Sequence, residues 1–361
     1  MKAKQLLELG ALAAAALSCS LSAAAAAATL IPILPVQGSD PNSTGVFGIN
    51  KSNIIVGFYT TDNYAVRHGF LGTLDGNYTT FDYGGNATGT TARAINDDNW
   101  VTGIADDEDC PLIGECEFVR QPDGTILNIE KDGVPLEGTV QGITAKEKLV
   151  GDYYTPDFHH YGYYGKAANY VKDLTLPCCT SVRPRAINRS GAVAGFYTTR
   201  RAHGFLLQNG IVTKIDYPDP NAYYTFPEGL NDGGLVAGNW NDKRQKHSYA
   251  FEVDTTTMTF TPINIPGATY TQAWGVNNAG LVAVGSDAGV FIYCPHAKNK
   301  CPASARAIEI PDMPTIRIRA EHFRSADCAR NCTNPESEKA EAMWRRGAER
   351  MLRKHPLLKL P

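Results

Sequence analysis

The sequence predicts an all-β protein built as a six-bladed β-propeller of four-stranded repeats, because one pattern recurs six times along its 361 residues. The copies begin near residues 48, 94, 142, 186, 229 and 275. Equivalent marker positions in the six copies are Ile49, Ile95, Ile143, Ile187, Leu230 and Val276, at intervals of 43 to 48 residues. Four-stranded propeller blades repeat at about 40 to 50 residues. Each copy also divides into short apolar segments separated by turn residues, as a blade requires.

A tight turn follows the marker in most copies. It reads Asn50-Lys51-Ser52-Asn53 in the first copy and Asn188-Arg189-Ser190-Gly191 in the fourth, with equivalents at residues 231–234 and 277–280. Asn at the first position, with Gly or Asn at the fourth, is typical of a type I turn that ends in a left-handed residue. The third copy has Glu147 at the fourth position, so we expect its turn to be the worst formed.

Glycine marks the predicted second strand in five of the six copies, eight residues after each marker: Gly57, Gly103, Gly151, Gly195 and Gly238. A glycine inside a strand indicates a close approach of another backbone segment. We expect this approach near the crowded axis of the propeller. The turn from the third to the fourth strand carries hairpin signals such as Asp75-Gly76 and Asn209-Gly210.

The start of the predicted mature chain resembles a fourth strand. Residues 29–36 read TLIPILPV, and the fourth strand of the fifth copy reads FTPINIP at residues 260–266. We therefore expect Leu30 to Leu34 to pair with residues 289–293 of the sixth copy, which would close the ring and cover an exposed sheet edge. Residues 306–311, RAIEIP, are a second candidate for the same place, so one of the two must be displaced or added as a fifth strand.

Residues 1–28 read as an export signal, with Lys2 and Lys4 before a short apolar run and an alanine-rich segment at its end. The run is too short and too rich in alanine to indicate a membrane span. Cys19 follows small residues in a way that resembles a bacterial lipoprotein signal. Cleavage near Ala28 and lipidation of Cys19 therefore remain alternatives, and both place the protein outside the cytoplasm, in the periplasm or the extracellular space.

The cysteines support export. Once Cys19 is removed or lipidated, eight of the nine cysteines remain, and an even count after a signal peptide indicates disulfides. We expect Cys110–Cys116 and Cys294–Cys301 to close short loops. The pairing of Cys178, Cys179, Cys328 and Cys332 stays open. No cysteine spacing is typical of a structural zinc site, so we expect no metal.

Charge divides the chain into two parts. The formal net charge is −3, but residues 313–361 carry 11 Lys and Arg against 6 Asp and Glu, which leaves residues 29–312 acidic. An acidic body lacks the basic footprint that nucleic acid requires. The tail predicts an amphipathic helix that begins at Asn334-Pro335. This helix either packs on the acidic body or lies on a membrane or a partner.

The first, fourth and fifth copies resemble the HAF-type extracellular repeat of exported bacterial proteins. They carry the sequences GIN, AIN or GLN, then a glycine-containing second strand, then HGFL or HSYAF. The resemblance covers about residues 45–312. The second copy has CEFV where HGFL belongs, and the sixth copy lacks the histidine. The resemblance implies a propeller-like repeat protein outside the cytoplasm and implies no activity.

Several residues invite a functional interpretation that the repeat pattern does not favour. His68, His203 and His247 recur in three copies, and a residue repeated for architecture packs or forms hydrogen bonds within its own blade. The acidic run at residues 106–109 lacks the spacing of a calcium loop. No catalytic motif is found, so we assign no catalytic residue and no cofactor.

The loops that join the second strand to the third, and one blade to the next, share one face of a propeller. On this face we expect the ligand-binding residues Tyr64, His159, His160, Arg200, Arg201, Tyr223, Tyr224, Trp240 and Lys243, because loops that differ between copies and carry aromatic and Arg groups are typical of binding sites. The alternative is that the aromatic side chains only cover the edges of the blades, and this explains their presence equally well.

Two classes of function follow from this interpretation. The first is an exported, non-catalytic binding or scaffold propeller that holds a carbohydrate, a peptide or an envelope partner through its loop face. The alternative is a glycan-active hydrolase or lyase with its site in the central pocket, which would need two carboxylates across a cleft. We expect contact with a membrane only through a lipid at Cys19 or through the tail helix.

Overall fold

The computed structural model describes residues 28–110, 112–155, 160–166, 170–176, 181–244, 246–295, 301–304 and 306–322. Residues 1–27 of the predicted signal peptide and the tail helix lie outside these ranges, as do His159 and the cysteines at positions 19, 178, 179, 328 and 332, whereas Ala28 begins the first strand. Within the described ranges every regular element is a β-strand. None of these residues forms a helix that is long and apolar enough to span a membrane.

The first three copies each contribute four antiparallel strands. They are β2 (Gly45–Ile49), β3 (Ile55–Thr61), β4 (Val66–Gly72) and β5 (Tyr78–Phe81); β6 (Gly89–Ile95), β7 (Val101–Asp106), β8 (Glu115–Arg120) and β9 (Ile126–Asn128); and β12 (Gly138–Ile143), β13 (Lys148–Tyr154), β14 (His160–Lys166) and β15 (Tyr170–Asp173). One parallel pairing, Arg67 with Gly89, joins the first two sets into a single sheet. A small hairpin, β10 (Glu130–Lys131) with β11 (Val134–Pro135), links the second copy to the third.

The last three copies form five-stranded sheets because segments from the two ends of the chain join them. Their strands, in sheet order, are β16 (Val182–Ile187), β17 (Val193–Thr198), β18 (Ala202–Gln208), β19 (Ile211–Lys214) and β29 (Glu321–His322); β20 (Ala222–Leu230), β21 (Leu235–Asp242), β22 (Ser248–Asp254), β23 (Thr259–Ile263) and β28 (Ile316–Arg317); and β24 (Thr271–Val276), β25 (Val282–Ser286), β26 (Gly289–Cys294), β1 (Ala28–Pro32) and β27 (Ile308–Ile310).

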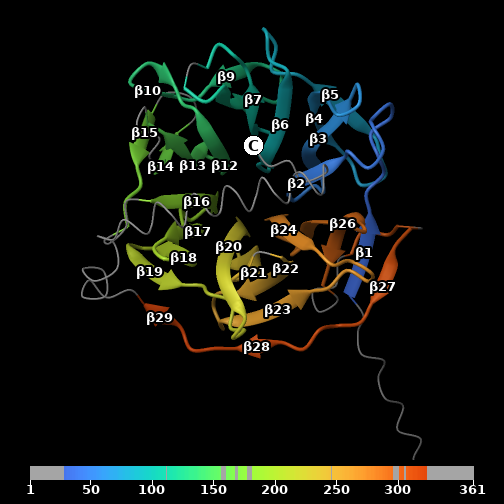
Figure 1. Ribbon diagram of the computed structural model, residues 1–361, viewed down its shortest axis with the longest axis vertical. Coiled ribbons are helices and arrows are strands. Elements are labelled where there is room, and N and C mark those ends of the chain that lie inside the picture. The colour runs from blue at the N-terminus through green and yellow to red at the C-terminus, as the bar shows by residue number, and fades with distance from the viewer. Residues whose placement is uncertain are drawn as a thin grey trace, which may run out of the picture.

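The sheets are arranged around a common axis in a propeller-like way (Figure 1). The first strand of each copy lies nearest the axis and contacts the first strand of the next copy, and β24 contacts β2. Apolar side chains fill the space between neighbouring sheets. Phe251 and Leu206 belong to one such cluster, between the fifth and fourth copies. Another cluster joins Trp274 of the last copy to Phe58 of the first. The core is therefore divided into layers between the sheets.

The inner turns have the conformation that the sequence predicts. Their fourth residues all lie in the left-handed region, with φ of 60° at Asn53, 63° at Asn99, 86° at Gly191 and 80° at Gly234. Glu147 is held there too, with φ of 57°. A left-handed conformation is costly for a residue with a long side chain, so this turn carries backbone strain that the other five avoid.

The second-strand glycines are required by close backbone contact, as predicted. Each stands opposite a β-bulge in the first strand, for example between Val46 and Gly48. A Cβ atom on Gly57 would lie 1.8 Å from the carbonyl oxygen of Gly45, and one on Gly195 would lie 2.2 Å from that of Arg183. The bulge turns the end of each first strand toward the axis, and the glycine leaves room for it.

The expected pairing of the two chain ends is confirmed. Leu30 pairs with Tyr293, and Pro32 pairs with Phe291. The backbone N–H of Ile33 donates to Val290 at 3.0 Å. The competing segment is added outside β1 as a fifth strand, with Leu30 opposite Ile308.

The segment after β27 differs from the expected boundary at residue 312. It continues around the outer edges of the sheets, where β28 pairs with β23 and β29 pairs with β19 (Figure 1). Residues 313–322 are therefore part of the sheet assembly and not only of a separate tail. Each short strand covers an edge that would otherwise expose unpaired backbone groups.

We predict that Leu30→Ala lowers the free energy of unfolding by about 2 to 5 kcal/mol, because Leu30 is buried between two sheets and its truncation leaves a cavity. Thermal unfolding followed by circular dichroism measures the effect. Ile308→Ala is the matched control on the neighbouring strand, since Ile308 is 45% exposed. Equal melting temperatures for the two variants would show that β1 does not hold the chain ends together.

We also predict that Glu147→Gly stabilises the protein by about 1 kcal/mol, since glycine adopts a positive φ without steric cost. Glu147→Ala keeps the backbone strain and is the control. Chemical unfolding measures both variants. A Gly variant no more stable than the Ala variant would argue against strain in this turn.

Candidate functional site

Three of the nine expected loop-face residues come together in the structure. The Arg201 guanidinium carbon lies 5.8 Å from the centroid of the Tyr223 ring, and the Lys243 Nζ atom lies 5.6 Å from the same centroid. Arg201 precedes β18, Lys243 follows β21, and Tyr223 lies in β20. These residues belong to the fourth and fifth copies, so the cluster spans the boundary between two sheets.

The other expected residues do not join this cluster. Tyr64 is bound to its own copy, where its hydroxyl donates to the carbonyl of Pro41 at 2.9 Å. Arg200 is exposed. Tyr224 and His160 are buried, with exposed fractions of 3% and 4%, so the expectation that they present themselves at a loop surface does not hold.

Trp240 is packed among aromatic rings. Its ring stacks on Tyr217 and Tyr249, at centroid distances of 5.1 and 4.4 Å. The packing interpretation of the sequence therefore fits Trp240 better than the binding interpretation.

A pocket lies beside Tyr223. Arg201, Lys214 and Asp216 form part of its wall, and Arg319 and Glu321 of the C-terminal segment form another part. The C-terminal segment is held there by an ion pair between Lys214 and Glu321 at 3.7 Å. The contribution of Arg319 and Glu321 could not be identified from the sequence, because these residues lie far from the fourth copy in the chain and belong to no repeat.

Asp216 organises the positive charges in this pocket. It accepts a hydrogen bond from His203 at 2.7 Å and lies 3.3 Å from Lys214 and 3.6 Å from Arg201. Burial raises the pKa of Asp216, but His203 and the two nearby cations outweigh burial, so its pKa lies below the usual value. Asp216 is therefore ionised at neutral pH and holds Arg201 and Lys214 in place.

Two of the three repeated histidines have equivalent contacts. His68 forms a hydrogen-bonded pair with Asp82 at 2.8 Å and stacks on Tyr59, as His203 does with Asp216 and Tyr197. Each histidine makes these contacts within its own sheet, as expected for a residue with a structural role.

His247 does not occupy the equivalent position. Tyr59 pairs with His68 in the first copy, and the corresponding Trp240 of the fifth copy pairs with Tyr249. His247 precedes β22 and is exposed. Tyr249 takes the position of His68, and His247 lies two residues before it, outside the strand.

Both predicted disulfides are present in the structure, between Cys110 and Cys116 and between Cys294 and Cys301. Cys116 stands in the third strand at the position that His68 occupies in the first copy.

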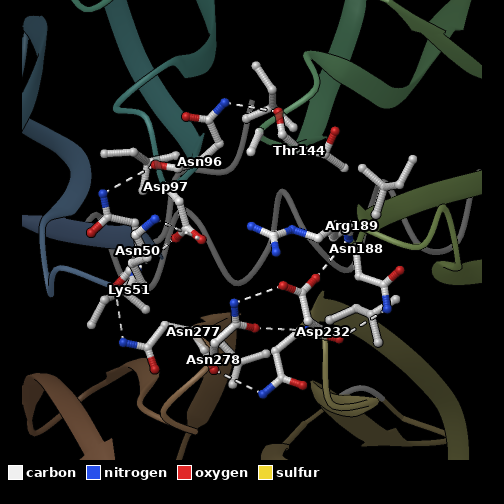
Figure 2. A pocket seen from close by; sticks show the side chains of 18 residues that line it. Asn50, Lys51, Asn96, Asp97, Thr144, Asn188, Arg189, Asp232, Asn277 and Asn278 are labelled. Atoms are coloured by element: carbon white, nitrogen blue, oxygen red, sulfur yellow. Dashed lines mark hydrogen bonds and ion pairs between the residues drawn. The ribbon is translucent and has the colours of Figure 1, made fainter.

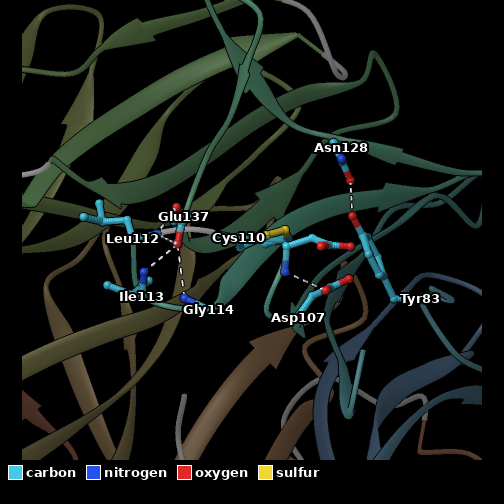
Figure 3. Close-up of a disulfide and its surroundings, with 10 residues drawn as sticks. Tyr83, Asp107, Cys110, Leu112, Ile113, Gly114, Asn128 and Glu137 are labelled. Atoms are coloured by element: carbon cyan, nitrogen blue, oxygen red, sulfur yellow. Dashed lines mark hydrogen bonds between the residues drawn. A yellow bond between two sulfur atoms is a disulfide. The ribbon is translucent and has the colours of Figure 1, made fainter. Parts of the chain in front are cut away.

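The loop closed by Cys110–Cys116 is further tied down by a carboxylate (Figure 3). Glu137 accepts backbone hydrogen bonds from Leu112 at 2.7 Å, from Ile113 at 2.6 Å and from Gly114 at 3.2 Å. In the neighbouring acidic run, residues 106–109, Asp106 forms an ion pair with Arg67 at 2.8 Å. Among the described residues, no group of three or more His, Cys, Asp or Glu side chains is placed to hold a metal ion.

A ring of inner-turn side chains surrounds one mouth of the central axis (Figure 2). Each asparagine amide donates to the backbone carbonyl of the equivalent residue in the next copy. The bonds run from Asn50 to Asn96 at 3.2 Å, from Asn96 to Thr144 at 2.9 Å, from Asn188 to Asn231 at 3.2 Å, from Asn231 to Asn277 at 2.9 Å and from Asn277 to Asn50 at 3.0 Å. Thr144 has no amide, so this relay is interrupted between the third and fourth copies.

The six markers form an apolar collar below this mouth and separate it from a second cavity, which has a volume of about 90 Å³. This axial cavity is lined by five of the six residues that stand two positions before a marker. They are Phe47, Arg93, Gln141, Glu228 and Trp274. The sixth, Arg185, lies beside Glu228. The backbone position is the same in every copy, yet five different residue types occupy it, whereas the neighbouring positions are nearly constant.

The axial ring was not identified from the sequence. An alignment of the six copies would have shown it as the position that varies most among nearly constant neighbours. Variation at one point of an otherwise repeated element indicates that this point is free of the architectural constraint and available for function.

Charged groups in and around the axial ring are buried and face one another. Arg185 Nε lies 3.7 Å from Glu228, and Arg93 donates to Gln141 at 3.2 Å. Burial lowers the pKa of Arg93 to about 9, and repulsion from Arg185 acts in the same direction. Burial raises the pKa of Glu228. Arg93 therefore remains a cation at neutral pH.

A second layer adjoins the ring. Asp152 pairs with His160 at 2.9 Å, with both side chains buried. Burial raises the pKa of Asp152, but His160, Arg183 and Arg185 together lower it to about 2. Asp152 and Glu228 thus lie in one charged network, and their environments shift their pKa values in opposite directions.

We predict that Thr144→Asn stabilises the protein by about 1 kcal/mol, because an amide at this position completes the relay with one more hydrogen bond to the next copy. Thr144→Ser keeps the hydroxyl without adding an amide and is the control. Thermal and chemical unfolding measure both. If the Asn variant is no more stable than the Ser variant, the relay is not a significant source of stability.

Comparison with known proteins adds only distant structural likeness. No protein family and no curated protein matches the sequence. Among solved structures, the chain is similar to virginiamycin B lyase from Staphylococcus aureus, with 12% identity over 70% of this chain and 95% of that one and a TM-score of 0.40. It is also similar to TolB from Acinetobacter baumannii, with 10% identity over 76% and 67% of the two chains and a TM-score of 0.45. A gluconolactonase from Xanthomonas campestris matches with 11% identity over 70% and 86%, and a TM-score of 0.43.

Proposed function

We propose that this protein is an exported, non-catalytic binding propeller that holds a carbohydrate in the loop-face pocket beside Tyr223. The proposal includes a closed six-bladed ring of HAF-type repeats. The observation that carries the binding function is the pocket wall formed by Arg201 and Tyr223 from two copies, with Lys243 beside the Tyr223 ring.

Two contacts support closure of the ring. The side-chain amide of Asn277 in the sixth copy donates to Asn50 in the first, and β1 from the start of the chain completes the sheet of the sixth copy. A propeller protects its sheet edges when its first and last blades meet in this way.

The two disulfides support export, because disulfides persist in oxidising compartments. The predicted signal at residues 1–28 points in the same direction. Lipidation at Cys19 and cleavage near Ala28 remain the two routes by which such a chain reaches the envelope or the medium.

The chemistry of the pocket fits a carbohydrate. Sugars offer apolar C–H faces, which pack on aromatic rings, and hydroxyl groups, which both donate and accept hydrogen bonds. Tyr223 supplies the ring. Lys214 and Arg201 supply donors, and Asp219 and Glu321 supply acceptors on the same wall. A protein or peptide partner would need a larger, flatter surface than this concave one.

We predict that Tyr223→Ala weakens oligosaccharide binding by about tenfold or more, because it removes the aromatic surface of the pocket. A glycan array followed by calorimetry with the best ligand measures this effect. Tyr223→Phe should retain most of the affinity, and Tyr164→Ala is the control at an exposed tyrosine of the third copy. Binding of peptides or envelope fractions in place of glycans would overturn the carbohydrate assignment.

The catalytic alternative has one specific observation in its favour. Asp152 and Glu228 share a buried network at the axis, and opposite pKa shifts of two carboxyl groups are typical of an acid and its ionised partner in glycan hydrolysis. Incubating the wild-type protein with its glycan ligand decides between the two functions. Release of shortened products by the wild type, but not by Glu228→Gln, would replace the binding proposal with a hydrolase or lyase.

A further inference from the structure

The axial ring contains hydrogen-bond donors that the protein itself does not use. The Nε and Nη1 atoms of Arg93 are buried and make no hydrogen bond to protein. The Nε2 atom of Gln141 is in the same situation. These two side chains are 95% and 91% buried, since their exposed fractions are 5% and 9%. Donors left unpaired at such depth are costly unless a ligand or water accepts from them.

Arg93 is arranged to present its donors to a planar acceptor. Its guanidinium carbon lies 4.5 Å from the Phe47 ring centroid and 5.5 Å from that of Trp274. A guanidinium that stacks on aromatic rings keeps its N–H groups free in its own plane, where they match the two oxygens of a carboxylate. One of these donors is occupied by Gln141, which fixes the plane.

The charges around the cavity agree with an anionic ligand. Arg93 is the cation among the residues that line the cavity. Glu228 also lines it, but pairs with Arg185 at 3.7 Å.

We propose that the axial cavity binds a monocarboxylate at Arg93. The carboxylate oxygens accept the unused donors of Arg93 and of Gln141. Glu228 in the same lining disfavours a ligand with a second carboxylate, because two carboxyl groups would then lie close together in the cavity. Phe47 and Trp274 provide the apolar surface for the remainder of the acid. This site is separate from the loop-face pocket and does not depend on the carbohydrate proposal.

Titration of the purified mature chain with sodium acetate, at constant ionic strength maintained with sodium chloride, tests the proposal. We expect a saturable rise of about 3 °C or more in the melting temperature and a change in tryptophan fluorescence that is lost in Trp274→Phe. Arg93→Gln should abolish the thermal response, whereas Lys51→Met at the axis mouth should retain it. Glucuronate in a parallel arm distinguishes a sugar acid from a small organic acid as the source of the carboxylate.

A second measurement keeps the proposal testable if Arg93→Gln does not fold. The wild-type protein should broaden the NMR signal of ¹³C-labelled acetate, and unlabelled acetate should compete. If the acetate signal does not broaden, water alone occupies these donors and the proposal is overturned. The proposal is also overturned if chloride produces the same thermal response as acetate. An identical acetate response in folded Arg93→Gln would overturn it as well.

Discussion

The relay of inner-turn asparagines is the interaction on which the arrangement of the sheets depends. Each asparagine uses both ends of its amide: the oxygen of Asn231 accepts from Gly233 and Leu235 in its own turn, and the nitrogen donates to the next copy. Local turn geometry and the contact between sheets are therefore fixed by one side chain. Because buried amides are costly when unpaired, the relay also fixes how far each sheet lies from its neighbour.

The interruption of this relay coincides with other irregularities. Thr144 replaces the asparagine in the third copy, and three residues later Glu147 adopts a positive φ. A small hairpin, β10 with β11, precedes this copy. In the other five copies, the turn position equivalent to Glu147 is occupied by Gly or Asn. The third copy therefore departs from the pattern in its turn, its side-chain relay and its connection at once.

The sequence predicted the features that repeat and missed those that do not. The period, the inner turns and the second-strand glycines follow from comparing copies, since each is a local constraint that recurs in most of the six. The pairing of β1 follows from the likeness of residues 29–36 to a fourth strand. The pairing of β28 and β29 with the outer edges could not be predicted, because two-residue strands leave no pattern. The burial of His160 was missed because its partner Asp152 lies on the neighbouring strand, β13, and strand register determines that contact.

The same constraint explains why chemistry concentrates at the axis. The bulge fixes the backbone of every first strand, with a facing glycine in five of the six copies. The apolar marker and, in five copies, the asparagine fix the next turn. The residue two positions before the marker is left without an architectural task, and five of these six residues line the axial cavity. A symmetric backbone thereby presents Arg93, Arg185 and Glu228 at equivalent points around the axis, and the asymmetry of the charges comes from the side chains.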